Sequence, residues 1–317
     1  MMPLTREQRR RVRRTHLKFQ GITGKTRESY RRALLDFFAY LRRQRIRRPK
    51  TFRLLDFHLG EYINECFQEG EPLTYAGHAL SGFHRFYPDS RGQLRTAWQY
   101  FNNWQRCHEP KRALPLTVTL VRAMAAKALL RRRPRLAVTF LVAFSIFLRT
   151  GEFLTLEFKR IFIPADHSVA VVGLENTKSS RRKRAKESVV IRDRPLIRFI
   201  AAVKSRCRRS ARVYPHSSYR FKRDMQGTLK RLGVQDKRFQ GYSFRRGGAS
   251  WYFLKTGRLD STVVRGRWQS EKTARIYIDD AAAELGRVQN DFRALKVDAL
   301  AKQLPLLMKR YCLASGR

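Results

Sequence analysis

Residues 147–156 read FLRTGEFLTL and join a long apolar segment to a short one across a single arginine and a glycine. The apolar segment, 136–148, is about 13 residues long, whereas a helix that spans a bilayer needs ~20, so it predicts a buried helix. A glycine turn at Gly151 is expected to start a second, short helix. A guanidinium beside a core is costly without an anionic partner. Arg149 therefore either forms an internal ion pair with Glu152 or is presented to a phosphate.

A second stretch, 242–250, reads YSFRRGGAS and places small residues after two arginines at the opening of a predicted helix. Gly247 and Gly248 have no side chain, so another backbone or a DNA strand can approach closely there. The N-terminus of a helix also favours anions. The alternative is a site of tight helix packing.

A third stretch, 266–278, reads GRWQSEKTARIYI, and Ser270 is expected to cap a short helix that ends near Tyr277. A single tyrosine in a helix usually serves the core or the surface. The significance of Tyr277 therefore depends on its order relative to the other two stretches.

Between the first two stretches the hydrophobic period changes from that of helices to that of strands. Residues 168–174 (SVAVVGL) and 187–191 (ESVVI) are short and rich in β-branched residues. The polar stretch between them, 177–184, reads TKSSRRKR. This pattern predicts a β-hairpin with a cationic tip.

Helical patterns dominate the remainder of the chain. Thr26 is the expected N-cap of the first helix after a basic arm over 1–20. The helices up to 110 predict a small all-helical domain over 21–110, and the proline and charges that follow read as a linker. Residues 111–285 form the second predicted domain, and 286–317 a C-terminal helix and tail. Apolar residues recur along that last helix at helical spacing, at Leu285, Val288, Phe292, Leu295 and Ala299.

The charge of the chain points to a polyanionic partner. It has 317 residues, with 69 Lys and Arg against 25 Asp and Glu, a net charge of +44. Such a charge repels itself and argues against an ordinary metabolic enzyme, so nucleic acid is the expected partner and membrane is not. The four cysteines are widely spread, which predicts neither a metal site nor disulfides. With no secretory signal in view, we expect an intracellular, DNA-associated protein, in the nucleus or the bacterial nucleoid.

Taken in order, these stretches resemble the tyrosine recombinases, the phage-integrase type of site-specific recombinase. The resemblance covers about residues 20–285 and rests on an arginine box, a hairpin lysine, a second arginine box and a tyrosine box. It implies a mainly α fold with a small β-hairpin or sheet. A helical core-binding domain that clamps DNA would precede the catalytic domain. The implied activity is DNA strand cleavage and rejoining without cofactor, metal or ATP.

The resemblance also assigns roles to residues. Tyr277 would be the nucleophile that forms a 3′-phosphotyrosine, and Arg149 and Arg245 would hold the phosphate. Lys178 would protonate the leaving oxygen, with Lys183 and Lys186 as competitors, and Glu152 would support the site. Trp268 would take a position often held by histidine. The remaining predicted DNA contacts are basic: Arg181, Arg182, Lys183, Arg184 and Arg246.

Tyr242 departs from the family pattern, because the second arginine box usually begins with histidine. A histidine exchanges a proton near neutral pH and a tyrosine does not. The leading interpretation is an active variant that works on double-stranded DNA as a tetramer, with its C-terminal helix docked on a neighbouring copy rather than on its own domain. The alternatives are a catalytically decayed DNA-binding protein, a type IB topoisomerase-like enzyme and a purely structural basic protein.

Overall fold

The chain divides into two compact units, 1–111 and 112–317. The computed structural model describes residues 6–7, 21–108, 113–174, 187–234, 236, 238–278 and 291–314. Each unit has its own hydrophobic core, and each is described here by itself. The predicted arm over 1–20 therefore lies almost wholly outside the described residues.

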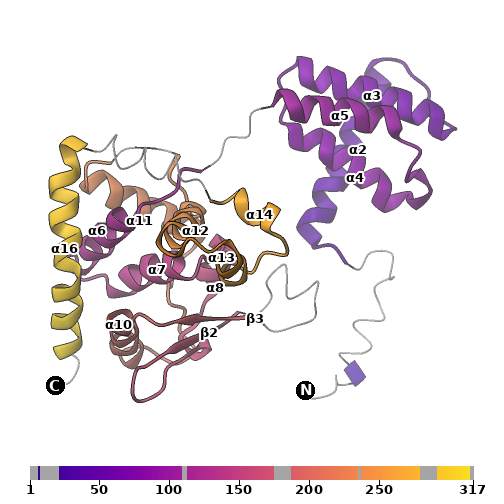
Figure 1. The fold of residues 1–317 in the computed structure, drawn as a ribbon. Helices are drawn as coiled ribbons and strands as arrows, with labels where there is room; N and C mark the ends of the chain where they lie inside the picture. Colours follow the sequence, from indigo (N-terminus) through magenta and orange to yellow (C-terminus); the bar gives the residue numbers. More distant parts are fainter. Residues whose placement is uncertain are drawn as a thin grey trace. The chain divides into compact units, whose positions relative to one another are not determined.

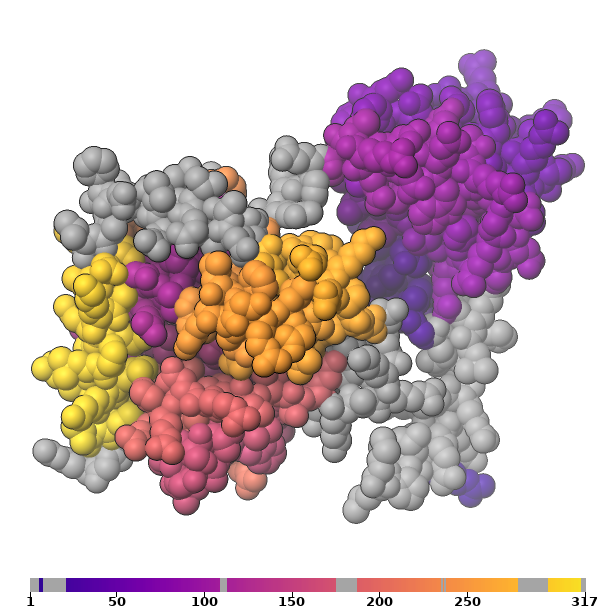
Figure 2. All heavy atoms as spheres, in the orientation of Figure 1, coloured from indigo at the N-terminus to yellow at the C-terminus, as the bar shows by residue number. Residues whose placement is uncertain are grey.

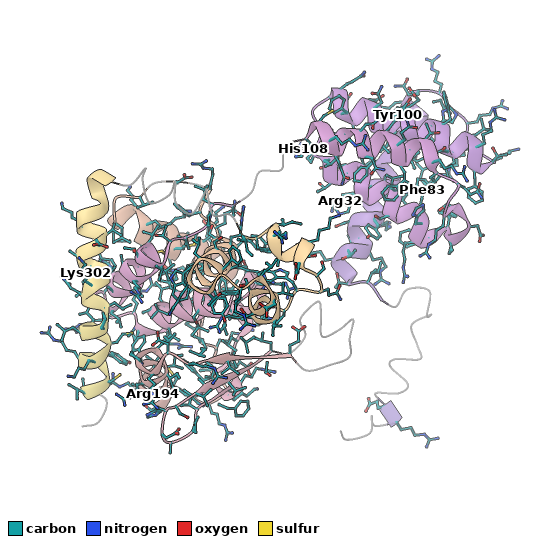
Figure 3. All side chains as sticks on the ribbon, in the orientation of Figure 1. Arg32, Phe83, Tyr100, His108, Arg194 and Lys302 are labelled. Carbon is teal, nitrogen blue, oxygen red and sulfur yellow. The ribbon has the colours of Figure 1, made fainter. Side chains whose placement is uncertain are left out.

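Between residues 21 and 108, the N-terminal unit is a bundle of four α-helices (Figure 1). They are α2 (Gly24–Arg43), α3 (Phe52–Gln68), α4 (Leu73–Phe86) and α5 (Arg95–Cys107), with a short 3₁₀ turn, η2 (Pro88–Ser90), before the last. Figure 3 labels Phe83 of α4 and Tyr100 of α5 within this bundle. The described elements of this unit are all helical.

Side-chain caps set where two of these helices begin. The prediction of Thr26 as the first N-cap is wrong, because Thr23 caps α2 and its hydroxyl accepts the N–H of Thr26. Asp56 of α3 is buried and accepts the backbone N–H groups of Thr96 and Ala97 at 2.9 Å each. That carboxylate satisfies the free donors at the start of α5 and ties the two helices together.

The second unit combines helices with a small antiparallel sheet that lies at one side of them (Figure 1). The sheet has the order β1 (Ile161–Phe162), β2 (Ala170–Leu174), β3 (Glu187–Ile191). Val172 faces Val189 across the predicted hairpin, and both side chains point into the core. The pairing of β2 with β3 confirms the strands of the predicted hairpin, whereas β1 was missed because two residues show no alternation.

Helices before and after the sheet complete the unit. The first three are α6 (Val118–Leu130), α7 (Pro134–Ser145) and α8 (Thr150–Thr155), with the 3₁₀ turn η3 (Phe158–Arg160) leading into β1. The later ones are α10 (Arg194–Ser205), α11 (Ser218–Arg231), α12 (Ser243–Thr256), α13 (Leu259–Gly266), α14 (Glu271–Arg275) and α16 (Asp291–Leu313). No helix in the described ranges is both long and apolar enough to cross a membrane.

The predicted buried helix is α7, but it stops at Ser145 rather than at Leu148. The chain turns at Phe147, which has a left-handed backbone with φ of 51°, a conformation that costs a bulky residue energy. Gly151 lies inside α8 and its φ is not positive, so the expected glycine turn is wrong. Phe147 makes the turn instead.

Helix α16 lies along α6 and also contacts α10 of the same chain (Figure 1). Its buried apolar side chains join the main core of the unit, and they are Val297, Ala301, Leu304 and Met308. Lys302, labelled in Figure 3, lies on the exposed side of the helix and pairs with Asp298. This packing is that of a helix docked on its own domain, the alternative to docking on a neighbouring copy.

A buried carboxylate holds α11 against the start of α7. Asp224 is 9% exposed and accepts the hydroxyl of Tyr214 at 2.8 Å. It also pairs with Arg133 and, at 3.3 Å, with Arg220. Because every partner is a donor, the carboxylate is stabilised in its charged form.

Candidate active site

The first predicted arginine stands at the start of α8. Glu152 folds back on the helix end: its Oε2 accepts the backbone N–H of Arg149 at 2.8 Å and its Oε1 accepts Nη1 of the guanidinium at 2.7 Å. An acidic residue in the first turn also suits the positive end of the helix. The ion pair considered from the sequence is therefore present, and the Arg149 side chain is still 29% exposed.

The second arginine is buried because its helix packs against main chain. A Cβ on Gly247 would lie 1.9 Å from the carbonyl oxygen of Leu116, and one on Gly248 would lie 2.2 Å from that of Phe144. The double glycine is thus a site of tight packing against backbone, and it sets α12 deep in the unit. Arg245, two residues earlier, is completely buried.

The Arg245 guanidinium is held by two carbonyl oxygens and two aromatic rings. Nη1 donates to Phe147 and Nη2 donates to Gly266, the latter at 2.7 Å. Its Cζ lies 4.5 Å from the centre of the Trp268 ring and 5.1 Å from that of Tyr277. These contacts stabilise the cation without neutralising it. Burial, with the charges of Arg149 and Arg267 adding to it, lowers the pKa of Arg245 to about 10.

Trp268 forms one wall of this site. Its ring lies so close to Gly266 that a Cβ there would be 1.9 Å from ring atom Cζ3, so only glycine fits. The ring centre is 4.8 Å from that of Tyr277 and 6.3 Å from that of Phe147. The indole N–H is buried and is directed at the Tyr277 side chain, where it helps to lower the pKa of Tyr277.

Tyr277 follows α14, whose N-cap is Ser270 as predicted. The rings of Tyr242 and Tyr277 are 5.5 Å apart, and a hydrogen bond joins their side chains. Burial raises the pKa of Tyr277, but the hydrogen bond from Tyr242 and the charge of Arg245 outweigh it and bring this pKa below the ordinary value for tyrosine.

Tyr242 is affected in the opposite direction. Its pKa is raised by burial and by the hydrogen bond to Tyr277, so it keeps its proton and is the donor of the pair. Arg149 is close enough that its charge acts on both tyrosines and on Arg245. The structure thus brings together five of the six residues predicted to be catalytic.

One arginine of this cluster, Arg267, was not predicted from the sequence. Its side chain is 7% exposed, and its Nη2 donates to Oε2 of Glu152 at 2.7 Å. A sequence signal was available, because a charged residue lies directly between the glycine and the tryptophan of the tyrosine box.

The arginine cluster, formed by Arg149, Arg245 and Arg267, has buried N–H groups that no acceptor in the described part of the chain satisfies. Nε of Arg245 and Nε and Nη1 of Arg267 are all buried and make no hydrogen bond of normal geometry with the described residues. A buried donor without an acceptor costs ~1–3 kcal/mol, and more when it is charged. Three guanidinium groups face two carboxylates, those of Glu152 and Glu187. Such a site favours a small oxyanion with several acceptor oxygens, as a phosphodiester has.

Other predicted site residues fall elsewhere. Lys178 and the predicted DNA contacts Arg181, Arg182, Lys183 and Arg184 lie outside the described residues. Arg246 is only 3% exposed and donates to the carbonyl oxygen of Ala113 at 2.9 Å, so its predicted role as a DNA contact is at odds with its burial.

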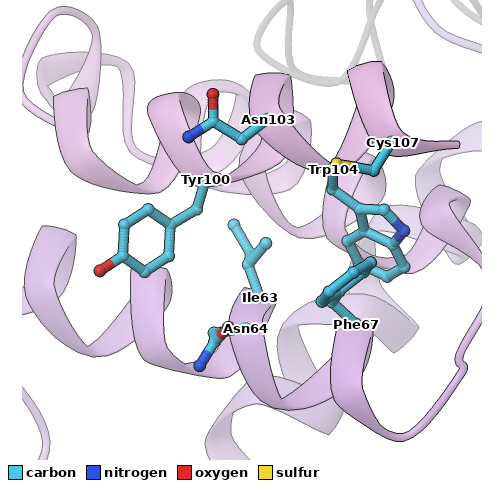
Figure 4. Close-up of a pocket in the computed structure, with 7 residues that line it drawn as sticks. All are labelled: Ile63, Asn64, Phe67, Tyr100, Asn103, Trp104 and Cys107. Carbon is cyan, nitrogen blue, oxygen red and sulfur yellow. The ribbon is translucent and has the colours of Figure 1, made fainter.

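A separate hollow of about 240 Å³ lies in the N-terminal unit between α3 and α5 (Figure 4). Its walls are mostly aromatic and amide side chains, with Ile63 and Cys107, and the rings of Phe67 and Trp104 meet edge to face at 5.6 Å. None of the predicted site residues lines it. The chemistry of the arginine cluster therefore belongs to the second unit, where the atoms of α12, α13 and α14 form a continuous patch, orange in Figure 2.

Comparison with solved structures places this fold. The chain resembles the Tn1549 transposon integrase in complex with transposon right end DNA, with a TM-score of 0.57, 12% identity, and coverage of 89% of this chain and 96% of the other. It also resembles the XerH recombinase in a post-cleavage complex with palindromic difH substrate, with a TM-score of 0.54, 14% identity, and coverage of 83% and 78%.

A third similar structure is a lambda integrase dimer bound to a COC′ core site, with a TM-score of 0.52, 17% identity, and coverage of 88% and 96%. No protein-family model and no curated protein sequence matches this chain. The chain therefore has the fold of the tyrosine recombinases and integrases, at a sequence identity that speaks for the fold alone. The predicted mainly α fold class with a small sheet is confirmed.

Proposed function

We propose that this protein cleaves and rejoins DNA strands through a covalent bond between Tyr277 and a 3′ phosphate. The observation that carries the proposal is the position of Tyr277. Its hydroxyl accepts a hydrogen bond from Tyr242, and its ring lies beside a buried guanidinium that has unused donors. A nucleophile of lowered pKa next to an anion site is what phosphoryl transfer requires.

The reaction exchanges one phosphoester for another. The Tyr277 proton passes to solvent, its oxygen bonds to phosphorus, and the bond from phosphorus to the 5′ oxygen breaks. Arg149 and Arg245 stabilise the charge on the non-bridging oxygens as the transition state forms. Because the ester energy stays in the phosphotyrosine, a 5′-hydroxyl of another strand can reverse the reaction without ATP. The reaction is expected to proceed in EDTA.

Protonation of the leaving 5′ oxygen is assigned to Lys178, with Lys183 and Lys186 as competitors. A substrate in which sulfur replaces that oxygen separates the three, since a thiolate leaves without a proton. Each of the three lysines is replaced by alanine in turn. The variant that lacks the general acid loses cleavage of ordinary DNA and regains it on the sulfur substrate. The other two variants stay close to wild type on both substrates.

Binding to double-stranded DNA is expected to depend mainly on phosphate contacts. The net charge of +44 supports this, as do the basic hairpin residues Arg181, Arg182, Lys183 and Arg184. Affinity is therefore expected to fall steeply as salt rises. The proposed cellular location, on intracellular DNA, follows from the same property.

The proposed active assembly is a tetramer on two DNA sites, formed when α16 leaves its own unit and docks on a neighbour. The support is the apolar face of α16. In the single chain this face packs on the core of its own unit, and the same surface of a neighbouring copy could accept it. Mass measurement of the complex on DNA with one and with two sites tests this assembly.

A substrate nicked beside the scissile phosphate tests the chemistry. Cleavage of such DNA releases a short fragment, which traps the covalent adduct. We expect an adduct with the wild type and none with Tyr277→Phe, while both proteins bind DNA equally. Binding without any adduct would favour a decayed or structural DNA-binding protein. Relaxation of supercoils without exchange between two DNA molecules would favour a topoisomerase.

A further inference from the structure

Arg267 is a costly residue for its position. Its backbone is left-handed, with φ of 56°, a region that glycine adopts freely and other residues adopt at an energetic cost. Its guanidinium is buried, and two of its nitrogens lack hydrogen-bond partners among the described residues. Burial lowers the pKa of Arg267, the nearby charge of Arg149 adds to this, and together they outweigh the opposite effect of Glu152 and Glu187. Stability alone would favour glycine, so the arginine requires another explanation.

One carboxylate connects Arg267 to Arg149. Oε1 of Glu152 binds the Arg149 guanidinium and Oε2 binds the Arg267 guanidinium, each at 2.7 Å. The Glu152 side chain is only 8% exposed, so its two oxygens are held in fixed directions. Oε2 also accepts the backbone N–H of Arg149, so the backbone of Arg149 and the guanidinium of Arg267 together set the direction of the carboxylate that holds the Arg149 side chain.

Arg267 also links Trp268, its neighbour in the chain, to Glu187 at the start of β3. Its main chain leads directly into Trp268, and its Nε is 3.8 Å from Oε2 of Glu187. Glu187 begins β3, immediately after the segment that carries Lys178. Arg149 is among the charges that lower the pKa of Tyr277. The ion pairs of Arg267 are with the carboxylates of Glu152 and Glu187.

We propose that Arg267 is a positioning residue for strand cleavage, which orients the Arg149 guanidinium toward the scissile phosphate through the Glu152 carboxylate. This inference rests on the proposed function. It predicts that Arg267 matters for the rate at which Arg149 stabilises phosphate charge and not for the stability of the fold.

The test replaces Arg267 by residues that tolerate a left-handed backbone. Arg267→Gly and Arg267→Asn are both expected to unfold at a temperature no lower than the wild type, since each removes a strained, buried charge. Their single-turnover cleavage of nicked DNA is expected to be ~10- to 100-fold slower, the range for loss of one hydrogen bond between charged groups. Arg258→Gln, which removes an arginine that is 69% exposed at the start of α13, is the matched control and is expected to cleave at the wild-type rate.

A substrate with a neutral methylphosphonate at the scissile position distinguishes positioning from a structural role. Removing the phosphate charge makes its compensation by Arg149 unnecessary, so Arg149→Ala is expected to regain cleavage on this substrate. If Arg267 acts through Arg149, Arg267→Gly regains cleavage too, and the double variant is no slower than Arg149→Ala on ordinary DNA.

Three outcomes would overturn the inference. A lowered unfolding temperature with equal slowing on both substrates would assign Arg267 a structural role. Wild-type rates in Arg267→Gly and Arg267→Asn, with a wild-type adduct present, would overturn this inference and leave the proposed function intact. Absence of any adduct with the wild type would overturn both.

Discussion

The Tyr242 hydroxyl donates a hydrogen bond to the oxygen of Tyr277, and the two residues differ in the direction of their pKa shifts. Tyr242 holds its proton more tightly than an ordinary tyrosine, and Tyr277 holds its proton less tightly. The residue that stands where the recombinase pattern has histidine is therefore a donor to the proposed nucleophile. A proton-exchanging group is not needed for that task.

Removing this donor should change the pH dependence of cleavage. In the wild type, the lowered pKa of Tyr277 means that phenolate forms at a pH below the ordinary tyrosine range, so the rate rises with pH early. Tyr242→Phe takes away the hydrogen bond, and the rise should move to higher pH. At neutral pH we expect a loss of about tenfold or more, the value of a hydrogen bond to a charged group. Single-turnover adduct formation on nicked DNA between pH 6 and 10 measures this.

Tyr219→Phe is the control for Tyr242→Phe, because the Tyr219 side chain is exposed and belongs to α11. It should leave the pH profile unchanged. A profile for Tyr242→Phe that keeps the wild-type midpoint and only scales down would contradict the role of Tyr242 as a donor.

The unused donors of the arginine cluster predict stabilisation by small oxyanions. An anion that binds only the folded protein raises its stability by ~2.7 kcal/mol at a hundredfold excess over its Kd. Phosphate or vanadate should raise the unfolding temperature above that in chloride of equal ionic strength. Arg149→Gln should lose most of this increase, and Arg258→Gln should keep it. Equal increases in both variants would mean that the anions act on the general surface charge.

Two glycines near the site predict opposite effects of alanine. At Gly266 a Cβ would overlap the Trp268 ring, so Gly266→Ala should lower the free energy of unfolding by ~1–3 kcal/mol and slow cleavage. At Gly151, inside α8, an added Cβ would meet nothing within 4 Å. Gly151→Ala should therefore raise the free energy of unfolding by up to ~1 kcal/mol through helix propensity. Chemical denaturation of both variants measures the difference.

The buried carboxylate on α11 predicts a stability that depends on acid. Burial raises the pKa of Asp224, but its hydrogen bonds with Arg133 and Tyr214 outweigh burial and lower it overall. A lowered folded-state pKa stabilises the protein above the unfolded pKa of ~3.9, and this stability is lost as pH falls through the folded value. Asp224→Asn should cost about 2 kcal/mol at pH 7. The gap to the wild type should begin to narrow below about pH 4 and vanish only below the folded-state pKa, so a gap that does not narrow on acidification would contradict the assignment.

Much of the fold could be predicted because its signals are local. The helical stripe of α2, the β-branched strands of the hairpin and the serine cap of α14 each follow from a few neighbouring residues. Predicted helix ends were wrong where contacts between distant parts of the chain determine where the helix stops. Phe147 takes a left-handed turn while its carbonyl oxygen binds Arg245, 98 positions away, and no local pattern contains that contact.

The site shows the same division. The types of residue and their order pointed to Arg149, Arg245, Trp268 and Tyr277, and the structure brings them together. The sequence could not show that Glu152 serves two arginines, because Arg267 reaches it only through the fold. Nor could it show that Arg246 points into the unit while Arg245, its neighbour, faces the site.

The double glycine of α12 has a consequence for mutational scanning. Because Gly247 and Gly248 touch protein main chain, a library sorted only for soluble expression, with no nucleic acid in the assay, should already be depleted of every other residue at these codons. Positions that tolerate no substitution are easily taken for catalytic residues, but at these two glycines the cause is helix packing. The same library can be sorted once for expression and once for adduct formation. Positions depleted in both sorts are needed for folding, and positions depleted only in the second are needed for the reaction.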